Sequence, residues 1–418
     1  MKNKKLFYVL LVVLAVGLIL VGCGSSEKAS TSSNSSSSTS SSSDSSSSSN
    51  SSSSETTVVK IATQSPLSGP YSAMGEAIKL GAEMALADNA EKFKALGVEL
   101  QLFPQDDQGD PKIGVSNAEG IVSDKQVLAL VGHLNSGVAR AAGPKYEAAK
   151  LPVVSPANTA VDLTTYGWAT FHRIVAKDDV QGPAGAKFAF EDLGAKSVYV
   201  VHDKTAYGQG LAEAFQEGAK ALGMNVLGFE GQEATQTDFT ALVNKIVAMK
   251  PDAIYFGGMY NQAGLLVKQA NERGFQGYFL SGDGSDNAEL IKIAGVDNVK
   301  KTYITSVAGD ASRTEEGKAW TQRYKEKFGK DSSTFSVYGY DATLVVLNAL
   351  EKAINENGGK VPTREELNKY VSATKDLKGV FTTTTFDEKG DNINAEVFIY
   401  SFEEGTYPAK FIKTVSVK

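Results

Sequence analysis

Cysteine and histidine are scarce in this chain of 418 residues, which contains only Cys23 and three histidines. A single cysteine cannot form a disulfide within the chain, so stability must come from packing. His133, His172 and His202 lie far apart with no cysteine near them, and none of them pairs with a GxSxG serine. We therefore predict that the protein binds no metal and no cofactor.

Clustered positive charge is also missing. The chain has 42 Lys and Arg against 48 Asp and Glu, which gives a formal net charge of −6. Nucleic acid is excluded as a partner, because binding to a phosphate backbone needs clustered Lys and Arg. A complete dinucleotide-binding motif is missing too, since Gly208-Gln209-Gly210 opens a glycine-rich string in which Glu213 replaces the third glycine. These absences argue against an enzyme.

The first residues have the features of an export signal. Lysines at positions 2, 4 and 5 precede an apolar run from Leu6 to Val21. The string Leu20-Val21-Gly22-Cys23 resembles a bacterial lipobox, in which the cysteine is acylated before cleavage leaves it as the new N-terminus. We expect residues 1–22 to be a lipoprotein signal peptide and Cys23 to anchor the protein by lipid to the outer face of the cell membrane, in an extracytoplasmic location. A membrane-spanning anchor with an incidental cysteine is the alternative, because the run is close to the roughly 20 apolar residues of a span.

A serine tract follows, and residues 25–54 contain little else. Such a composition has no apolar surface to bury, so residues 23–55 should form a flexible, disordered tether. At about 5–6 Å times the square root of its length, the tract has a typical reach of about 30 Å. The globular part, from about Thr56 onward, can then stand off the membrane and still stay near it.

The part after residue 55 holds about 360 residues, more than one hydrophobic core usually organises, which suggests two domains. Short β-branched or aromatic runs alternate with longer helical stretches, a pattern typical of α/β folds with parallel sheets covered on both faces. The predicted strands are 58–63, 99–103, 127–131, 152–155, 198–202, 253–256, 278–280 and 302–306. The predicted helices include 75–96, 112–123, 207–222, 239–249, 262–273, 314–328 and 340–355.

The predicted strands fall into two sheets, and the tail of the chain departs from the alternation of strands and helices. We expect one sheet to end near Ala176 and a second to begin near Val198. In the tail, residues 380–387 and 395–401 flank the turn Glu388-Lys389-Gly390-Asp391, which predicts an antiparallel hairpin.

Candidate ligand contacts follow the predicted strands, because ligands of open α/β sheets gather outside the carboxyl ends of strands. Ser136 stands where a helix begins, so it could bind a carboxylate or merely cap the helix. After the next strand, Ala157 offers a carbonyl and Thr159 a hydroxyl, unless the segment is a generic turn. Tyr207 and Asp283 follow strands of the second half, although Asp283 taken alone is typical of a solvated turn.

Together these loops resemble a known family. The segments Gly132-His133-Leu134, Ser155-Pro156, Ile174 with Gln181-Gly182-Pro183, His202-Asp203-Lys204 with Tyr207-Gly208, Gly257-Gly258 and Gly282-Asp283-Gly284 occur in that order. They resemble the leucine/isoleucine/valine-binding proteins of ATP-driven importers. The resemblance implies a type I periplasmic-binding-protein fold, an α/β fold with two doubly wound parallel-sheet lobes joined by three hinge crossings. It divides the chain into residues 56–177 and 306–385 for the N-lobe, and 178–305 and 386–418 for the C-lobe.

The resemblance also implies a ligand site. Ser136, Ala157 and Thr159 would hold the α-carboxylate and α-ammonium of an amino acid from the N-lobe, and Tyr207 and Asp283 would close over it from the C-lobe. Asp283 departs from the glutamate expected there, which leaves open whether a water or a tighter closure holds the ammonium.

Two further positions depart from the family pattern at the ligand side chain. Met74 and Met259 replace expected aromatic residues, and they either line the pocket or pack within the lobes. Because methionine adapts to irregular apolar shapes, several aliphatic ligands should fit. Gly109 and Asn135 stand where some relatives have a disulfide.

The implied function is capture of a branched-chain amino acid by lobe closure and its delivery to the membrane permease of an ABC importer. Two alternatives stay open. One is a ligand-sensing lipoprotein of the same fold that signals to a receptor. The other is a binding protein for another small amino acid or amide.

Overall fold

Parallel strands form the first sheet of the computed structural model, which describes residues 56–416. The predicted signal peptide, Cys23 and serine tether lie outside these residues. The sheet has the order β2–β1–β3–β4–β5, and every neighbouring pair is parallel. The strands are β1 Thr57–Ser65, β2 Val98–Asp106, β3 Val127–Gly132, β4 Val153–Ser155 and β5 Phe171–Arg173. Four of these strands were predicted, whereas β5 is only three residues long and gave no recognisable pattern.

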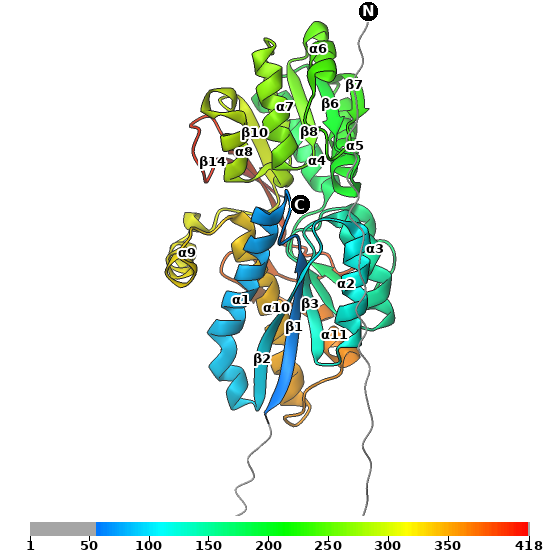
Figure 1. Cartoon of the computed structure of the whole chain (residues 1–418), viewed down its shortest axis with the longest axis vertical. Coiled ribbons are helices and arrows are strands. Elements are labelled where there is room, and N and C mark those ends of the chain that lie inside the picture. Colours follow the sequence, from blue (N-terminus) through cyan, green and yellow to red (C-terminus); the bar gives the residue numbers. More distant parts are fainter. Residues whose placement is uncertain (1–55, 417–418) are drawn as a thin grey trace, which may run out of the picture. The chain divides into compact units, whose positions relative to one another are not determined.

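Helices cover both faces of this sheet and complete the N-lobe. They are α1 Ser72–Ala95, α2 Pro111–Ser123, α3 Ser136–Ala148, α10 Thr334–Glu356 and α11 Arg364–Ser372. Helices α1 and α10 lie side by side although they are far apart in the sequence (Figure 1). Gly81 and Gly339 permit this approach, because a side chain at either would collide with the backbone of the other helix. The N-lobe is therefore built from two distant stretches of the chain.

The second sheet belongs to the C-lobe and has the order β14–β13–β10–β9–β8–β6–β7 among the described residues. Strands β6 to β10 are parallel, and β13 and β14 form an antiparallel edge. The strands are β6 Ser197–His202, β7 Asn225–Gly231, β8 Ala253–Gly257, β9 Tyr278–Ser281, β10 Thr302–Ser306, β13 Glu396–Ser401 and β14 Lys410–Ser416. The accompanying helices are α4 Asp178–Lys187, α5 Ala206–Ala221, α6 Thr240–Met249, α7 Tyr260–Glu272 and α8 Ala288–Ala294.

Between residues 56 and 416 the chain passes from one lobe to the other three times. The first passage leads from β5 into α4. The second leads from β10 through α9 (Glu315–Phe328) into α10. The third leads from α11 through the short ribbon β11 (Leu377–Lys378) and β12 (Thr383–Thr384) into β13. The predicted α/β architecture of two parallel-sheet lobes is confirmed.

The predicted hairpin across Glu388-Lys389-Gly390-Asp391 is present only next to its turn, where Phe386 and Asn392 form an antiparallel bridge and Asp387 N donates to Asp391 O at 2.9 Å. Its predicted second strand, residues 395–401, is wrong. Strand β13 pairs with β10 and β14, and not with residues 380–387. A local turn is present, since Gly390 N donates to Asp387 O at 3.1 Å, but Gly390 O accepts from the backbone N of Arg173 at 2.9 Å. Contacts with distant segments therefore limit the hairpin to the residues next to its turn.

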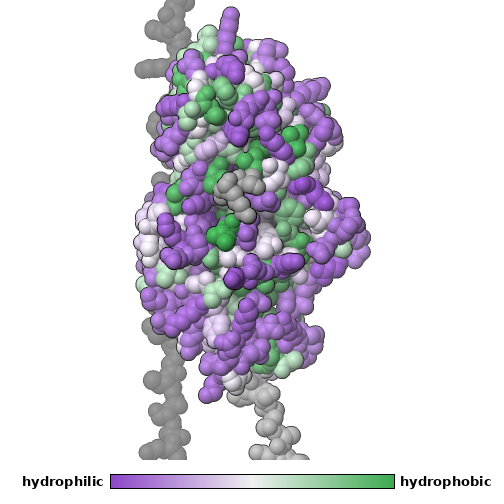
Figure 2. Space-filling model, turned by 180° about the vertical axis from the view of Figure 1, so that it is seen from behind, coloured by the Kyte–Doolittle hydropathy of each residue, from purple (hydrophilic) through white to green (hydrophobic). Residues whose placement is uncertain are grey.

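Large apolar side chains are mostly internal. Among residues 56–415 the exposed exceptions are Tyr166, Met249, Val296, Ile393 and Ile412. Figure 2 shows one face of the molecule as mainly hydrophilic, with apolar residues gathered near its middle. None of the helices between residues 56 and 416 combines the length and hydropathy needed to cross a membrane.

Candidate functional site

Ser136 is the first residue of α3, directly beyond the carboxyl end of β3, and it is buried. The helix cap is Asn135, whose side chain makes no capping hydrogen bond. The hydroxyl of Ser136 accepts instead from Ala160 N at 3.4 Å, so it links two strand-end loops. The interpretation of Ser136 as a simple N-cap is therefore wrong.

The loop after β4, residues 156–160, is held by its own polar side chains. Ser155 Oγ accepts from the backbone N of Ala157 at 3.2 Å and of Asn158 at 2.8 Å. Asn158 in turn accepts from His133 N and donates to Leu134 O, which fixes this loop against the one that precedes α3. A generic turn would not need these buried contacts. These hydrogen bonds therefore hold the loop, with Ala157 and Thr159, in a defined conformation.

Thr159 is completely buried, and its hydroxyl lies close enough to the Asp178 carboxyl to lower the pKa of that group, but neither side chain makes a hydrogen bond of ordinary geometry within the described residues. Leaving a buried hydroxyl unpaired costs about 1–3 kcal/mol. Such an atom is a candidate for a contact with a ligand.

Tyr207 and Asp283 meet in the C-lobe. Tyr207 Oη, from the first turn of α5, donates to Asp283 Oδ1 at 2.9 Å and accepts from Gly284 N at 2.8 Å. Gln181 Nε2, from α4, donates to the same Asp283 oxygen at 2.8 Å. Burial raises the pKa of Asp283 to about 6, although the hydrogen bonds from Gln181 and Tyr207 oppose the rise. Asp283 is thus a buried acid, and the interpretation of it as a solvated turn residue is wrong.

Asp178 is a second buried acid that sequence reasoning missed. It opens α4, and its backbone N donates to Thr159 O at 2.9 Å. Burial and the nearby Asp283 raise the pKa of its carboxyl well above the usual range. In the sequence, Lys177-Asp178-Asp179 looks like an ordinary charged helix start, so only the packing of α4 distinguishes it. Gln181 could have been found, because it lies in the quoted Gln181-Gly182-Pro183 segment.

Unpaired acceptors dominate this cluster. Both carboxyl oxygens of Asp178 and Oε1 of Gln181 have no hydrogen-bond partner in the part of the chain that the structure describes. With Asp283 and the Thr159 hydroxyl they form a buried group that is rich in acceptors and poor in cations. Buried acceptors and negative charge favour a cationic ligand group such as an ammonium.

A small cavity of about 10 Å³ lies between the lobes at this point. It is lined by Met74, Leu134, Asn135, Ala157, Tyr207, Met259, Asp283 and Gly284. Met74, Ala157, Tyr207, Met259 and Asp283 were thus placed together by sequence reasoning and lie together here. Ser136 and Thr159 are buried in the adjoining loops but do not line the cavity. Leu134, Asn135 and Gly284 were not predicted, although each adjoins a predicted strand-end motif.

Two further features limit where a ligand can bind, namely a contact between the lobes and the position of the other cavities. The lobes touch directly, since Tyr260 Oη of α7 donates to Pro70 O at 2.6 Å. Cavities of about 580 and 670 Å³ lie beside α9 and at the start of β1, but they contain none of the residues predicted for the ligand. Within residues 56–416, no group of three or more His, Cys, Asp or Glu side chains is arranged to hold a metal ion.

Comparisons with known proteins agree on one family. A family model described as periplasmic binding protein matches residues 58–406. The Leu/Ile/Val-binding protein of Escherichia coli (strain K12) is 32% identical over 333 residues, which cover 80% of this chain and 88% of that protein. The leucine-, isoleucine-, valine-, threonine- and alanine-binding protein of Pseudomonas aeruginosa is 30% identical over 346 residues, with 83% and 90% covered.

Solved structures agree as well. A leucine-binding protein from Thermotoga maritima superimposes with a TM-score of 0.78 at 32% identity, covering 86% of this chain and 99% of that one. A branched-chain amino acid transporter substrate-binding protein from Streptococcus pneumoniae, in complex with isoleucine, has a TM-score of 0.76 at 26% identity, with 85% and 99% covered.

Proposed function

The chain belongs to the Leu/Ile/Val-binding protein family of periplasmic binding proteins, and from this premise we propose that it captures leucine, isoleucine or valine for an ABC importer. Members of this family are substrate-binding proteins and not enzymes. The observation that carries the choice of ligand is the buried cluster of acceptors beside a methionine-lined cavity. An α-amino acid with an aliphatic side chain matches that site, because its ammonium suits the acceptors and its side chain suits the methionine-lined cavity.

The charged end of the ligand faces groups of opposite character. Its carboxylate lies toward Ser136, where the start of α3 supplies backbone N–H groups and a favourable dipole. Its ammonium lies toward Asp283 and the Thr159 hydroxyl, with the unpaired carboxyl oxygens of Asp178 as further acceptors. Ala157 already donates its N–H to Ser155, so we assign its carbonyl to the ammonium.

The apolar end of the ligand lies against Met74, Met259 and Leu134. Unbranched thioether side chains adapt to irregular shapes, so leucine, isoleucine and valine should compete for one site. One methylene changes binding by only about 1–3 kcal/mol in such pockets. We expect the three amino acids to bind with affinities within about two orders of magnitude of one another.

Binding requires the lobes to separate. A cavity of about 10 Å³ is at the lower limit for a single water and cannot admit an amino acid. Opening breaks the bond between Tyr260 and Pro70, and closure around the ligand restores it. The closed form is the state that the permease recognises.

We also propose that Cys23 is lipidated and that the serine tract tethers the protein to the outer face of the membrane. Support comes from the lysines before the apolar run and from the lipobox-like string that ends in Cys23. A Cys23→Ala variant, which can be neither acylated nor cleaved at the lipobox, should keep residues 1–22 and incorporate no labelled fatty acid, whereas the wild type should lose these residues and carry the label. A wild type that is uncleaved and unlabelled would favour the spanning anchor.

A ligand screen tests the proposed function. Residues 55–418, a stretch within one compact unit, are unfolded and refolded to remove prebound ligand and then melted with each of the twenty amino acids and several amides. Ligand raises the melting temperature according to its concentration over Kd. Shifts confined to leucine, isoleucine and valine support the proposal. A shift with only another amino acid or an amide replaces the cargo, and no shift at all refutes amino acid binding.

Transport and sensing are separated by a second measurement. Uptake of labelled leucine by cells should fall when the gene is deleted and return with the wild-type chain. Normal uptake in the deletion strain would favour the ligand-sensing alternative.

A further inference from the structure

Arg173, the last residue of β5, has a completely buried guanidinium, yet it does not line the ligand cavity. Its Nη1 donates to Asn158 O at 3.1 Å and to Ala160 O at 2.8 Å. These two carbonyls flank Thr159, whose own carbonyl accepts from Asp178 N. The loop that presents Thr159 is therefore held from both ends of the first passage, by Arg173 before it and by Asp178 after it.

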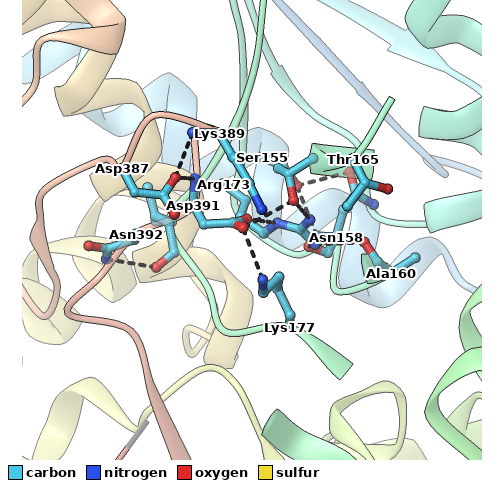
Figure 3. Close-up of polar contacts among 12 residues, drawn as sticks. Ser155, Asn158, Ala160, Thr165, Arg173, Lys177, Asp387, Lys389, Asp391 and Asn392 are labelled. Atoms are coloured by element: carbon cyan, nitrogen blue, oxygen red, sulfur yellow. Dashed lines mark hydrogen bonds and ion pairs between the residues drawn. The ribbon is translucent and has the colours of Figure 1, made fainter. Parts of the chain in front are cut away.

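The other side of the guanidinium contacts the third passage (Figure 3). Arg173 Nε donates to Asp391 Oδ1 at 2.7 Å, and the backbone N of Arg173 donates to Gly390 O. Lys177, within the first passage, lies 3.2 Å from Asp391 Oδ2. One buried ion pair thus joins the first passage, the third passage and the ligand loop.

The contacts use the full fork of the guanidinium. Besides Nε and Nη1, Arg173 Nη2 donates to Thr164 Oγ1 at 2.7 Å, and that hydroxyl donates to Asp391 Oδ2 at 3.1 Å. A lysine has a single donor atom and cannot reproduce this planar arrangement. The geometry depends on arginine and not only on positive charge.

We propose that Arg173 is a positioning residue that, with Asp391, couples the conformation of the first and third passages to loop 157–160 and so sets ligand affinity. Passages between lobes absorb the backbone rotation of hinge closure, so an ion pair that spans two of them changes its geometry when the lobes move. Because Arg173 holds the carbonyls of Asn158 and Ala160, a shift of its guanidinium moves both residues. Thr159, which lies between them, moves as well. The inference rests on the proposed function, because it assumes that Thr159 contacts the ligand.

The test compares two variants with a matched control in the mature chain from residue 23 onward, purified in detergent. Arg173→Lys keeps the charge and removes the fork, and Asp391→Asn removes the charge of the partner at nearly constant volume. Arg364→Lys is the control, because Arg364 also holds backbone carbonyls, those of Val127 and Val122, but at the start of β3, opposite to the strand end that the ligand loop follows. Both readouts, leucine affinity by calorimetry and hydrogen exchange of the peptide that covers loop 157–160, are taken well below every melting temperature.

The expected result separates positioning from stability. Arg173→Lys and Asp391→Asn each weaken leucine binding at least about fivefold and speed exchange in loop 157–160, and the double variant loses less than the product of the two losses. Arg364→Lys lowers the melting temperature but keeps the leucine Kd within about twofold. Unchanged affinity and unchanged exchange in Arg173→Lys and Asp391→Asn would overturn the proposal. If the wild type binds no amino acid, the proposed function fails alone, and the exchange comparison still decides whether Arg173 holds the loop.

Discussion

Replacing Asp283 by Asn probes the center of the proposed site with little change in shape. The amide oxygen can still accept from Tyr207 and Gln181, so the loop after β9 should keep its place. The substitution removes the buried negative charge that faces the ligand ammonium. Loss of one partner in a buried charge pair costs about 2–5 kcal/mol, so leucine should bind from about 30-fold to several thousand-fold more weakly.

The raised pKa of Asp283 also predicts an effect of the opposite sign, on the stability of the ligand-free protein. Its folded-state value of about 6 lies roughly two units above the ordinary value, so the ionised carboxyl destabilises the ligand-free protein by about 3 kcal/mol above pH 6. This penalty declines as the pH falls from about 6 to 4, since the folded state then binds the proton more tightly than the unfolded state. Asp283→Asn should therefore stabilise the ligand-free protein at pH 7.5 and have little effect near pH 4.

Ligand affinity has the reverse pH dependence. The ammonium binds the ionised carboxyl, so the leucine Kd of the wild type should rise about tenfold from pH 7 to pH 5 and stay level above pH 7. The rise should be smaller in Asp283→Asn. Calorimetry measures affinity at these pH values, and urea unfolding measures ligand-free stability.

Asp203→Asn is the matched control for this prediction. Asp203 is also buried at a strand end, accepts from Thr205 and has a pKa raised by burial to about 6, but it does not line the cavity. Its variant should change stability and leave the leucine Kd unaltered. The reasoning is refuted if Asp283→Asn binds leucine like the wild type, or if Asp203→Asn loses as much affinity.

Three further predictions concern the same cavity. Thr159→Val should weaken leucine binding by about 1–3 kcal/mol without lowering ligand-free stability, and a calorimetric loss larger than that of Asp283→Asn would contradict this order. Met74→Leu and Met259→Leu stiffen the apolar wall, so the spread of Kd among leucine, isoleucine and valine should widen by up to about tenfold, and an unchanged spread would place both methionines outside the pocket. Gly284→Ala puts a Cβ 2.8 Å from Gly258 O and should abolish binding in a thermal-shift assay, whereas Gly120→Ala, with nothing within 4 Å, should bind normally.

The architecture was predictable because the alternation of apolar strands and helices is a local property of the sequence. Strand β3, with all six residues buried, reads as an uninterrupted apolar run. The hairpin at Glu388-Lys389-Gly390-Asp391 forms only next to its turn, because residues 396–401 pair with β10 and β14, and Arg173 of another passage takes the carbonyl of Gly390. A turn signal describes four residues, and it contains no information about a partner more than 200 residues away.

The site was predictable where residues sit in strand-end motifs, as Tyr207 and Asp283 do. Asp178 and Arg173 were not, because Asp178 stands in an ordinary charged helix start and Arg173 stands alone in an apolar segment without any motif, and only tertiary packing buries them. Whether a charged group is buried depends on the elements that pack over it. Asp178 is buried where α4 packs against α5 and β10, and Arg173 is buried where the third passage contacts β5. In a structure, such residues are found by searching for buried charged side chains and for the groups that pair with them.

The pairing of α1 with α10 and of β10 with β13 has a consequence for biosynthesis. The first sheet is complete by residue 173, but α10, which packs on α1, spans residues 334–356. The second sheet waits for β13 and β14, the last strands described. Neither core can close until most of the chain has been made, because contacts so distant in sequence form late and slowly. A nascent chain with this topology should complete both cores only late in synthesis, which favours its passage through a narrow secretion channel before it folds.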